Sequence, residues 1–174
     1  MRTNLHTRAD YGFPAVSDSN ASVLILGSMP SRKSLDEQQY YAYPRNAFWP
    51  VMGALFDFGA GLPYEQRLEQ LKNKRIALWD VAHCCVRPGS LDADMREVEA
   101  NDFIAFFAAH TQVRHVFFNG RKAEELFRRM VLPRLSDSVK AMELHPLPST
   151  SPAHAGMSRE QKQAAWGIVK QCIA

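Results

Sequence analysis

Short apolar runs that end in small or polar residues alternate with amphipathic stretches along most of this chain. The first run is Val23-Leu24-Ile25-Leu26, which stops at Gly27 and has the length of a buried strand. The stretches between the runs carry apolar residues at helical spacing. Strands that alternate with helices form a mainly parallel sheet covered on both faces. We therefore expect an α/β fold, a three-layer α/β/α sandwich with a central four-stranded, mostly parallel sheet.

The pattern also predicts where the elements lie. Strands are expected at 22–26, 75–81, 113–118 and 140–144, and helices at 34–39, 47–56, 64–73, 101–110, 121–131 and 158–172. Ser34 and Ser158 are the predicted caps of the first and last helices, each with Glu or Gln three residues later. No repeat or linker interrupts the chain, so residues 22–174 should form one domain after a polar arm at 1–21.

Composition limits the class of protein. A net charge of +3 permits an anionic partner without requiring one. The three cysteines, Cys84, Cys85 and Cys172, lack CxxC spacing, which predicts reduced thiols rather than a disulfide framework or an iron–sulfur cluster. The N-terminus lacks the apolar core of a signal peptide, and no apolar run is long enough to span a bilayer. We expect a cytoplasmic monomer with no metal, no other cofactor and no membrane partner.

Polar and small residues follow each predicted strand. They are 27–31 after the first strand, 80–83 at the second, 119–120 at the third and 145–154 at the fourth. Ligands of open α/β sheets bind outside the carboxyl ends of the strands, so these residues are the candidate site. Just beyond the first of them, 40–49 brings Tyr and Trp rings together with one amide, Asn46. Flat rings beside an isolated amide suit a planar heterocycle.

The sequence resembles the uracil-DNA glycosylase superfamily, in particular its branch of hypoxanthine-DNA (deoxyinosine) glycosylases. The resemblance covers the chain from Val23 to the C-terminal helix and rests on LILGSMPS (24–31), QYYAYPRNAFW (39–49), LWDVAHCCVRPGSLD (78–92), VFFNGRKAEELF (116–127) and LPSTSPAHA (147–155). The first and last segments resemble the superfamily's two active-site loops. YPRNAFW is the segment most specific to the branch.

The resemblance implies roles for particular residues. Asn46 is the expected catalytic residue, because the branch uses the Asn of its PRNAFW segment. Phe48 is the expected ring that stacks on the base. The other expected base contacts are Gly27, Ser28, Met29, Pro30, Asp80 and Asn119. The expected DNA contacts are Ser31, Arg45, Pro148, Ser149, Thr150, Ser151 and His154.

The chain departs from the superfamily's patterns in its two active-site loops. Ser28 or Met29 stands where other members carry an Asn or Asp that positions water, and Ser31 stands where a Gly is usual. Leu147 stands where the catalytic loop His would lie, so His145 or His154 is a candidate replacement.

Structural roles remain open beside the functional ones. Asn46 also suits the N-cap of its helix, Phe48 the core, Asp80 a cap or an ion pair, and Asn119 a turn with Gly120. The two loop histidines also suit ordinary loop positions. Arg32, Lys33 and Arg45 suit phosphate contacts or a solvated cationic face equally well.

The activity that the resemblance implies fits these residues. Cleavage of an N-glycosidic bond passes through a sugar cation and a departing base anion, which dipoles and an oriented water assist. We expect a monofunctional DNA glycosylase whose partner is DNA containing a deaminated base, preferably hypoxanthine. No lysine is among the candidate site residues, so no lyase step is expected. The alternatives are uracil or mismatch-type excision, a nucleic-acid-binding module without activity, and a small-molecule nucleotide hydrolase.

Overall fold

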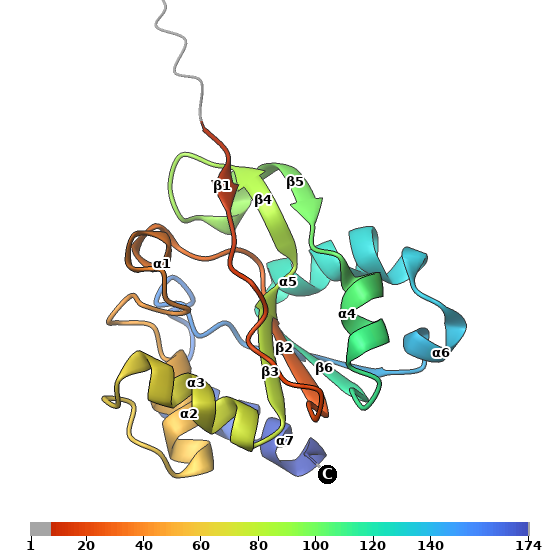
Figure 1. The fold of residues 1–174 in the computed structure, drawn as a ribbon. Coiled ribbons are helices and arrows are strands. Elements are labelled where there is room, and N and C mark those ends of the chain that lie inside the picture. Colours follow the sequence, from red (N-terminus) through yellow and green to blue (C-terminus); the bar gives the residue numbers. More distant parts are fainter. Residues whose placement is uncertain (1–7, 174) are drawn as a thin grey trace, which may run out of the picture.

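The computed structural model describes residues 8–173 of the 174-residue chain. Its named strands and helices run in the order β1 (Asp10–Tyr11), β2 (Val23–Gly27), α1 (Arg32–Glu37), α2 (Phe48–Phe56), α3 (Tyr64–Asn73), β3 (Ile76–Asp80), β4 (Ala82–Val86), β5 (Arg96–Ala100), α4 (Phe103–Ala109), β6 (His115–Asn119), α5 (Arg121–Leu126), α6 (Asp137–Lys140), β7 (Glu143–Leu147) and α7 (Arg159–Cys172). Figure 1 shows their arrangement. Short 3₁₀ turns lie at Asp92–Asp94 and Leu132–Arg134, and a π-helical turn at Phe127–Val131 continues α5.

Four parallel strands form the central sheet, in the order β3-β2-β6-β7. The expected three-layer fold with a four-stranded sheet is confirmed. The register pairs Gly27 with Asp80 and Asn119 with Leu147, so the polar strand ends meet along one edge of the sheet.

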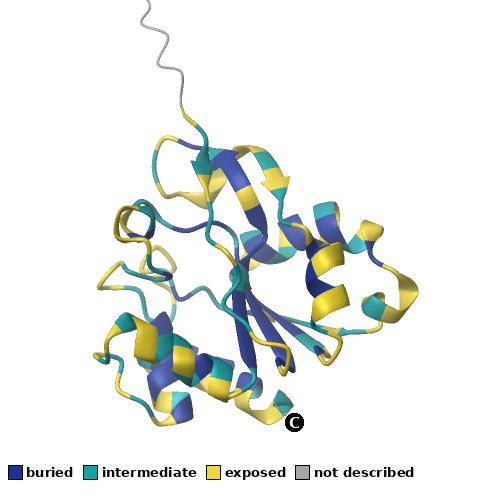
Figure 2. Cartoon of the chain, in the orientation of Figure 1, coloured by how far each residue is buried: buried dark blue, intermediate teal, exposed yellow. Residues whose placement is uncertain are grey.

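Helices cover both faces of this sheet, α2, α3 and α7 on one and α4 and α5 on the other (Figure 1). Val23 and Ile25 of β2 pack in the core beneath α2, α3 and α7, whereas Leu24 and Leu26 pack in the core beneath α4 and α5. Side chains that alternate along a strand require this division. Figure 2 shows β2, β3 and β6 mostly buried and the outward faces of the helices exposed. Burial on both faces explains why β2, β3 and β6 have apolar sequences, whereas β7 is more exposed and its sequence is mixed.

A second, antiparallel sheet in the order β1-β4-β5 was not expected from the sequence. No strand was predicted directly after the one at 75–81, but β4 follows β3 after a single residue and pairs with β5 through irregular register. β5 is mostly exposed and β1 has two residues, so neither has the apolar run that predicts a strand. This sheet positions the loop between β4 and β5 beside the first loop of the central sheet.

Two predicted boundaries were wrong. The fourth strand was expected at 140–144, but 137–140 form α6 and the strand is Glu143–Leu147. Within residues 8–173, β7 pairs with β6 alone, and such an edge strand tolerates Pro146. Ser31, not Ser34, caps α1, because the Ser31 hydroxyl accepts from the Ser34 amide. The predicted capping box of α7, Ser158 with Gln161, is confirmed.

Residues 8–21, expected to be part of an arm, lie against the domain. β1 pairs with β4, and Val16 forms a bridge with Leu78 of β3. The carbonyl oxygens of Phe13 and Pro14 accept hydrogen bonds from Trp79 and the Tyr40 hydroxyl. This segment therefore helps to hold the tyrosine-rich stretch after α1 in place. The part of the expected arm at 1–7 is outside the described residues.

Across 8–173, no helix combines the length and the apolar character that a membrane crossing needs.

Candidate active site

A cavity of about 840 Å³ opens at the carboxyl ends of the parallel strands. Residues from all four predicted strand ends line it, so the structure brings together distant parts of the sequence. Its lining is Gly27, Ser28, Met29, Pro30, Ser31, Arg32, Lys33, Ser34, Asp36, Tyr40, Tyr41, Tyr43, Asn46, Asp80, Ser90, Leu91, Asp92, Ala93, Asn119, Thr150, Ser151, Pro152, Ala153 and His154. This volume is in the range of sites that enclose a small ligand.

The first loop begins with a glycine because the backbone there is crowded. A Cβ on Gly27 would lie within 3.0 Å of a carboxylate oxygen of Asp80 and of the Tyr41 hydroxyl. The Gly27 carbonyl accepts from the Val81 amide, and the Ser28 carbonyl from the Ala82 amide. The loop is thus fixed against the end of β3, and Met29 and Pro30 are buried in it.

Asp80 places a buried carboxyl group in the wall of the cavity. Asp80 is 3% exposed, and its Oδ2 atom has no hydrogen-bond partner among the described residues. Burial raises the pKa of Asp80 to about 7, the cation of Arg87 opposes this shift, and the charge of Asp92 adds to it. A neutral carboxyl offers one O–H donor and one carbonyl acceptor, whereas the ionised form only accepts.

Tyr41 lines the cavity, as Tyr40 and Tyr43 do, whereas Phe48 does not. Phe48 has no exposed surface and stacks behind Tyr41, with ring centroids 4.1 Å apart and planes 23° from parallel. The expectation that Phe48 stacks on a base is therefore not supported by its position. Tyr41 has a left-handed backbone conformation, φ 55°, which is strained for a bulky residue and is found at functional sites.

The amide oxygen of Asn46 bonds to the start of α2, and its amide nitrogen remains free for the cavity. Its Oδ1 accepts a 2.9 Å hydrogen bond from the Phe48 amide at the start of α2. The residue that directly precedes the helix is Ala47, so Asn46 acts as a cap from one position further out. Because the Phe48 N–H fixes the oxygen, the Nδ2 group is the end free to donate into the cavity that Asn46 lines.

Thr150 joins three walls of the cavity. The Asn119 amide donates to the Thr150 hydroxyl and accepts from the Thr150 backbone N–H, both at 2.9 Å. The Thr150 carbonyl accepts from the Ala47 amide, next to Asn46. Thr150 is 1% exposed, so its side chain positions the loop and is not available to a phosphate, which corrects the expectation of a DNA contact. Asn119 lines the cavity with its amide already engaged.

The rest of the loop at 148–154 is held by α7 and by its own serines. The Pro148 carbonyl accepts from Trp166, and the Ser151 carbonyl from the Lys162 amine. The hydroxyls of Ser149 and Ser151 accept from backbone amides two residues later. Gly120 faces this loop with φ +93°, and a Cβ there would lie 3.1 Å from the Ser149 Cβ. Pro152, Ala153 and His154 form the exposed part of the cavity rim.

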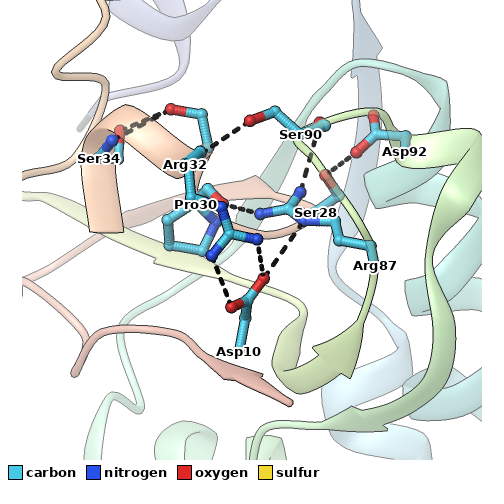
Figure 3. Close-up of polar contacts among 9 residues, drawn as sticks. Asp10, Ser28, Pro30, Arg32, Ser34, Arg87, Ser90 and Asp92 are labelled. Carbon is cyan, nitrogen blue, oxygen red and sulfur yellow. Dashed lines mark hydrogen bonds and ion pairs between the residues drawn. The ribbon is translucent and has the colours of Figure 1, made fainter. Parts of the chain in front are cut away.

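The loop after β4 forms a wall that the sequence analysis did not predict. Ser28 donates a 2.6 Å hydrogen bond to Asp92, and the Arg32 amide donates to the Ser90 hydroxyl (Figure 3). These contacts bring the carboxylate of Asp92 into a cavity whose own first loop lacks one. Leu91 lies at the rim and is 59% exposed.

A buried arginine, Arg87, supports this wall of the cavity. Arg87 is 2% exposed and donates to the Pro30 carbonyl and, at 3.4 Å, to the Ser90 carbonyl. Asp10 binds Arg32 through both carboxylate oxygens and lies 3.9 Å from Arg87 (Figure 3). Asp10 of β1 thus contacts Arg32, which lines the cavity, and lies near Arg87, which supports the cavity wall.

The two candidate histidines have different positions. His154 lies at the cavity rim. His145 is in the middle of β7, with its ring stacked on Phe117 and 3.1 Å from His115, and it does not line the cavity. The proposal that His145 replaces the missing loop histidine is therefore wrong, since β7 directs its side chain elsewhere.

The cations near the cavity are engaged to different extents. Arg32 is held by Asp10, and the Lys33 amine lies 2.6 Å from Glu37. Arg45 is exposed, beside Asn46, and forms no ion pair with residues 8–173.

A family model described as the uracil DNA glycosylase superfamily matches residues 13–170. The chain belongs to this superfamily. The resemblance seen in the sequence is thus confirmed, and the cavity lies where the segments that resemble the superfamily's active-site loops converge.

Relatives within the superfamily match over most of the chain. A protein of Methanosarcina acetivorans named hypoxanthine DNA glycosylase is 40% identical over 162 residues, which cover 91% of this chain and 96% of the relative. A protein of Methanosarcina barkeri with the same name is 38% identical over 115 residues, 66% of this chain and 73% of the relative. The solution NMR structure of a Methanosarcina acetivorans protein, provisionally named a uracil DNA glycosylase, has a TM-score of 0.79 and 37% identity, covering 93% of this chain and 96% of the other.

Proposed function

We propose that this protein is a monofunctional DNA glycosylase that hydrolyses the N-glycosidic bond of a deaminated base, preferably hypoxanthine, flipped out of DNA. Membership of the uracil DNA glycosylase superfamily supports the reaction class, and the names of the two Methanosarcina relatives support the base. An enzyme of this kind extrudes the target nucleotide and reads it in a pocket by hydrogen bonds and stacking. The cavity at the strand ends supplies both kinds of contact.

The observation that carries the proposal is the unpartnered, buried carboxyl of Asp80 in the cavity wall. Hypoxanthine, uracil and xanthine share a ring N–H beside a carbonyl group. A neutral carboxyl is complementary to this edge, because it donates to the carbonyl oxygen and accepts from the N–H. A buried polar atom without a partner is costly in the free protein, and such a base would satisfy it.

Tyr41 supports the same interpretation. Its ring lines the cavity and is backed by Phe48, which keeps its orientation fixed. Stacking of a flipped base on an aromatic ring is worth about 1–3 kcal/mol. We assign this stacking to Tyr41, with Phe48 as its support.

Hydrolysis is assigned to Asn46 and Asp92. The N-glycosidic bond breaks with its electron pair passing to the base, which takes a proton from solvent, while water adds to the sugar carbon. The Nδ2 group of Asn46 donates either to the departing base or to the water oxygen. The carboxylate of Asp92, oriented by Ser28, accepts the proton of the water and offsets the positive charge of the sugar.

Water rather than an amine is the proposed nucleophile. Lys33 lines the cavity, but its amine is paired with Glu37, and the Lys162 amine donates to the Ser151 carbonyl. We therefore propose no lyase step. A borohydride-reducible enzyme–DNA adduct would contradict this.

The DNA surface is proposed around the cavity rim. The proposed DNA contacts remain Ser31, Arg45, Pro148, Ser149, Ser151 and His154. The serine hydroxyls that accept from backbone amides still have a proton to donate to phosphate oxygens. Leu91 and Tyr43 add two exposed apolar side chains, 59% and 40% exposed, for contact with unstacked bases.

The proposed enzyme acts as a monomer, because one chain supplies every residue assigned above. It would work where the chromosome is, in keeping with the expected cytoplasmic location.

Base release from matched duplex oligonucleotides, carrying deoxyinosine or deoxyuridine, tests the proposal. The wild-type protein should release hypoxanthine faster than uracil, and Asn46→Ala should lose about 10²–10³-fold in rate, as when one donor to a developing negative charge is removed. Salt-dependent binding to the same duplex should persist in Asn46→Ala, which shows that the variant is folded.

The other outcomes separate the alternatives. Faster release of uracil would favour the uracil or mismatch-type activity. DNA binding without release of either base would favour the inactive binding module. Cleavage of free deoxyinosine without salt-dependent DNA binding would favour the small-molecule hydrolase.

A further inference from the structure

A second cluster of reactive side chains lies away from the cavity, at the opposite end of the sheet. His115 begins β6, Glu143 begins β7, and Cys172 ends α7. His145 stands two residues into β7 and faces the same cluster. Since the cavity is at the carboxyl ends of these strands, the cluster takes no part in the proposed reaction.

Three donor atoms converge in this cluster, and the carboxylate of Glu143 lies beside two of them. The Nδ1 of His115 and the Nε2 of His145 are 3.1 Å apart, and a carboxylate oxygen of Glu143 lies 3.7 Å from each. The ligand atoms of the two histidines and Cys172 all lie within 4.8 Å of one another. The histidine side chains are 20% and 17% exposed, so the cluster is sheltered and still open to an ion from solvent.

This donor set favours one class of ion. Imidazole nitrogen and thiolate sulfur are the ligands of zinc and similar transition metals, whereas Mg²⁺ and Ca²⁺ select oxygen. Bonds of about 2.0–2.3 Å in a tetrahedral zinc site separate neighbouring ligand atoms by roughly 3.3–3.8 Å. The separations of Glu143 from the two histidines have this value, and the exposed Glu143 side chain would rotate toward Cys172 to complete the site.

We propose that His115, His145, Cys172 and Glu143 form a zinc-type metal site. No motif spacing marks these ligands, because they meet only through the arrangement of β6, β7 and α7. A hydrogen bond between the two imidazoles explains their own contact, but it does not explain why a thiol lies within 4.8 Å of both and a carboxylate 3.7 Å from both.

The site would have a structural role. A metal bound there joins the last turn of α7 to the N-terminal ends of β6 and β7. The same helix supports the cavity loop through Trp166 and Lys162. The metal would thus stabilise the helix on which the loop at 148–154 depends.

Zinc binding to untagged, metal-stripped protein tests this inference. After equilibrium dialysis against Zn²⁺, elemental analysis should find one zinc per chain, and the thermal midpoint should rise relative to the stripped protein. Co²⁺ in place of Zn²⁺ should give a thiolate-to-cobalt charge-transfer band in the near ultraviolet.

Two substitutions at the site and two elsewhere make the test specific. Cys172→Ser should abolish the cobalt band and, like His145→Gln, weaken zinc binding by at least about 10-fold. His83→Gln and Cys84→Ser, which alter a histidine and a cysteine of β4, should leave the affinity unchanged. Cys172 lies in the last helical turn, so its variant should fold even if His145→Gln does not. Failure of the wild-type protein to retain zinc, or equal retention by Cys172→Ser, would overturn the inference.

Discussion

The hydroxyl of Ser28 donates a 2.6 Å hydrogen bond to a carboxylate oxygen of Asp92, 64 positions further along the chain. Ser28 belongs to the first loop of the central sheet, and Asp92 to the loop between the two strands of the antiparallel sheet. Other members of the superfamily, as the resemblance implies, place an Asn or Asp in the first loop itself. In this chain a serine occupies that loop and holds a carboxylate from elsewhere.

Asp92→Asn tests whether this carboxylate takes part in the reaction. We expect a loss of about 10²–10⁴-fold in single-turnover base release, the usual contribution of a positioned general base. Ser28→Ala should cause a smaller loss, because the carboxylate remains but is no longer oriented. Asp94→Asn, two residues away and outside the cavity lining, is the matched control. Equal activity of Asp92→Asn and the control would remove Asp92 from the mechanism.

Asp80 should make both stability and activity depend on pH. Its pKa is raised from an ordinary 3.8 to about 7, so the folded state binds a proton that the unfolded state has already lost. The contribution of Asp80 to the free energy of unfolding is therefore most favourable below pH 4. It falls between pH 4 and 7 by an amount on the order of 4 kcal/mol. Base release should also fall as pH rises through 7, because the ionised carboxyl no longer donates to the base carbonyl.

Asp80→Asn provides the comparison for these pH profiles. An amide keeps one donor and one acceptor at all pH values, so this variant should release hypoxanthine with a flat profile across pH 7. Its urea unfolding free energy should lack the fall between pH 4 and 7. A wild-type profile that matches the variant's would mean that Asp80 does not titrate in this range.

Gly27→Ala should impair activity more than folding. The added Cβ would meet the Asp80 carboxylate and the Tyr41 hydroxyl, which displaces the groups assigned to the base. Displacement of such groups by about 1 Å costs on the order of 100-fold in rate. Gly61→Ala, where a Cβ meets nothing within 4 Å, is the control. Steady-state base release and circular dichroism on both variants measure the contrast.

Tyr41 should tolerate loss of its hydroxyl and not of its ring. The hydroxyl is buried without a hydrogen-bond partner among the described residues, so Tyr41→Phe should leave stability unchanged or raise it. Tyr41→Ala should weaken capture of the flipped base by about 10–100-fold through loss of stacking. The KM for a deoxyinosine duplex measures this effect, and an unchanged KM would exclude stacking on Tyr41.

Three strands of the central sheet, β2, β3 and β6, were predictable because they are buried and have apolar sequences, whereas the bounds of the more exposed β7 were not. The same reasoning placed Gly27, Asp80 and Asn119 at one edge of the sheet, where the structure finds the cavity. The antiparallel sheet was not predictable, because β5 is exposed and β1 is too short to show a period.

The parts of the site that were missed depend on tertiary contacts. Asp92 reaches the cavity only because β4 and β5 bring its loop beside Ser28. Tyr41 and Phe48 are both aromatic and close in sequence, so no pattern could show which faces the ligand. Tyr41 has a left-handed backbone and its hydroxyl lies close to Gly27, while Phe48 lies on the buried face of α2. Thr150 was misassigned because sequence does not show that its hydroxyl is already bonded.

Asn46 divides its side chain between folding and chemistry, with the oxygen bonded to the start of α2 and the nitrogen left to the cavity. An aspartate there would keep the helix contact and replace two donors with an acceptor. Asn46→Asp should therefore melt close to the wild type, while Asn46→Ala melts lower. Asparagine and aspartate codons differ by one A-to-G change, which is the mutation that unrepaired hypoxanthine leaves in DNA. Unrepaired hypoxanthine, the proposed substrate, would thus cause the mutation that converts Asn46 to aspartate. The protein would then lose the donor assigned to catalysis while its melting temperature stayed close to that of the wild type.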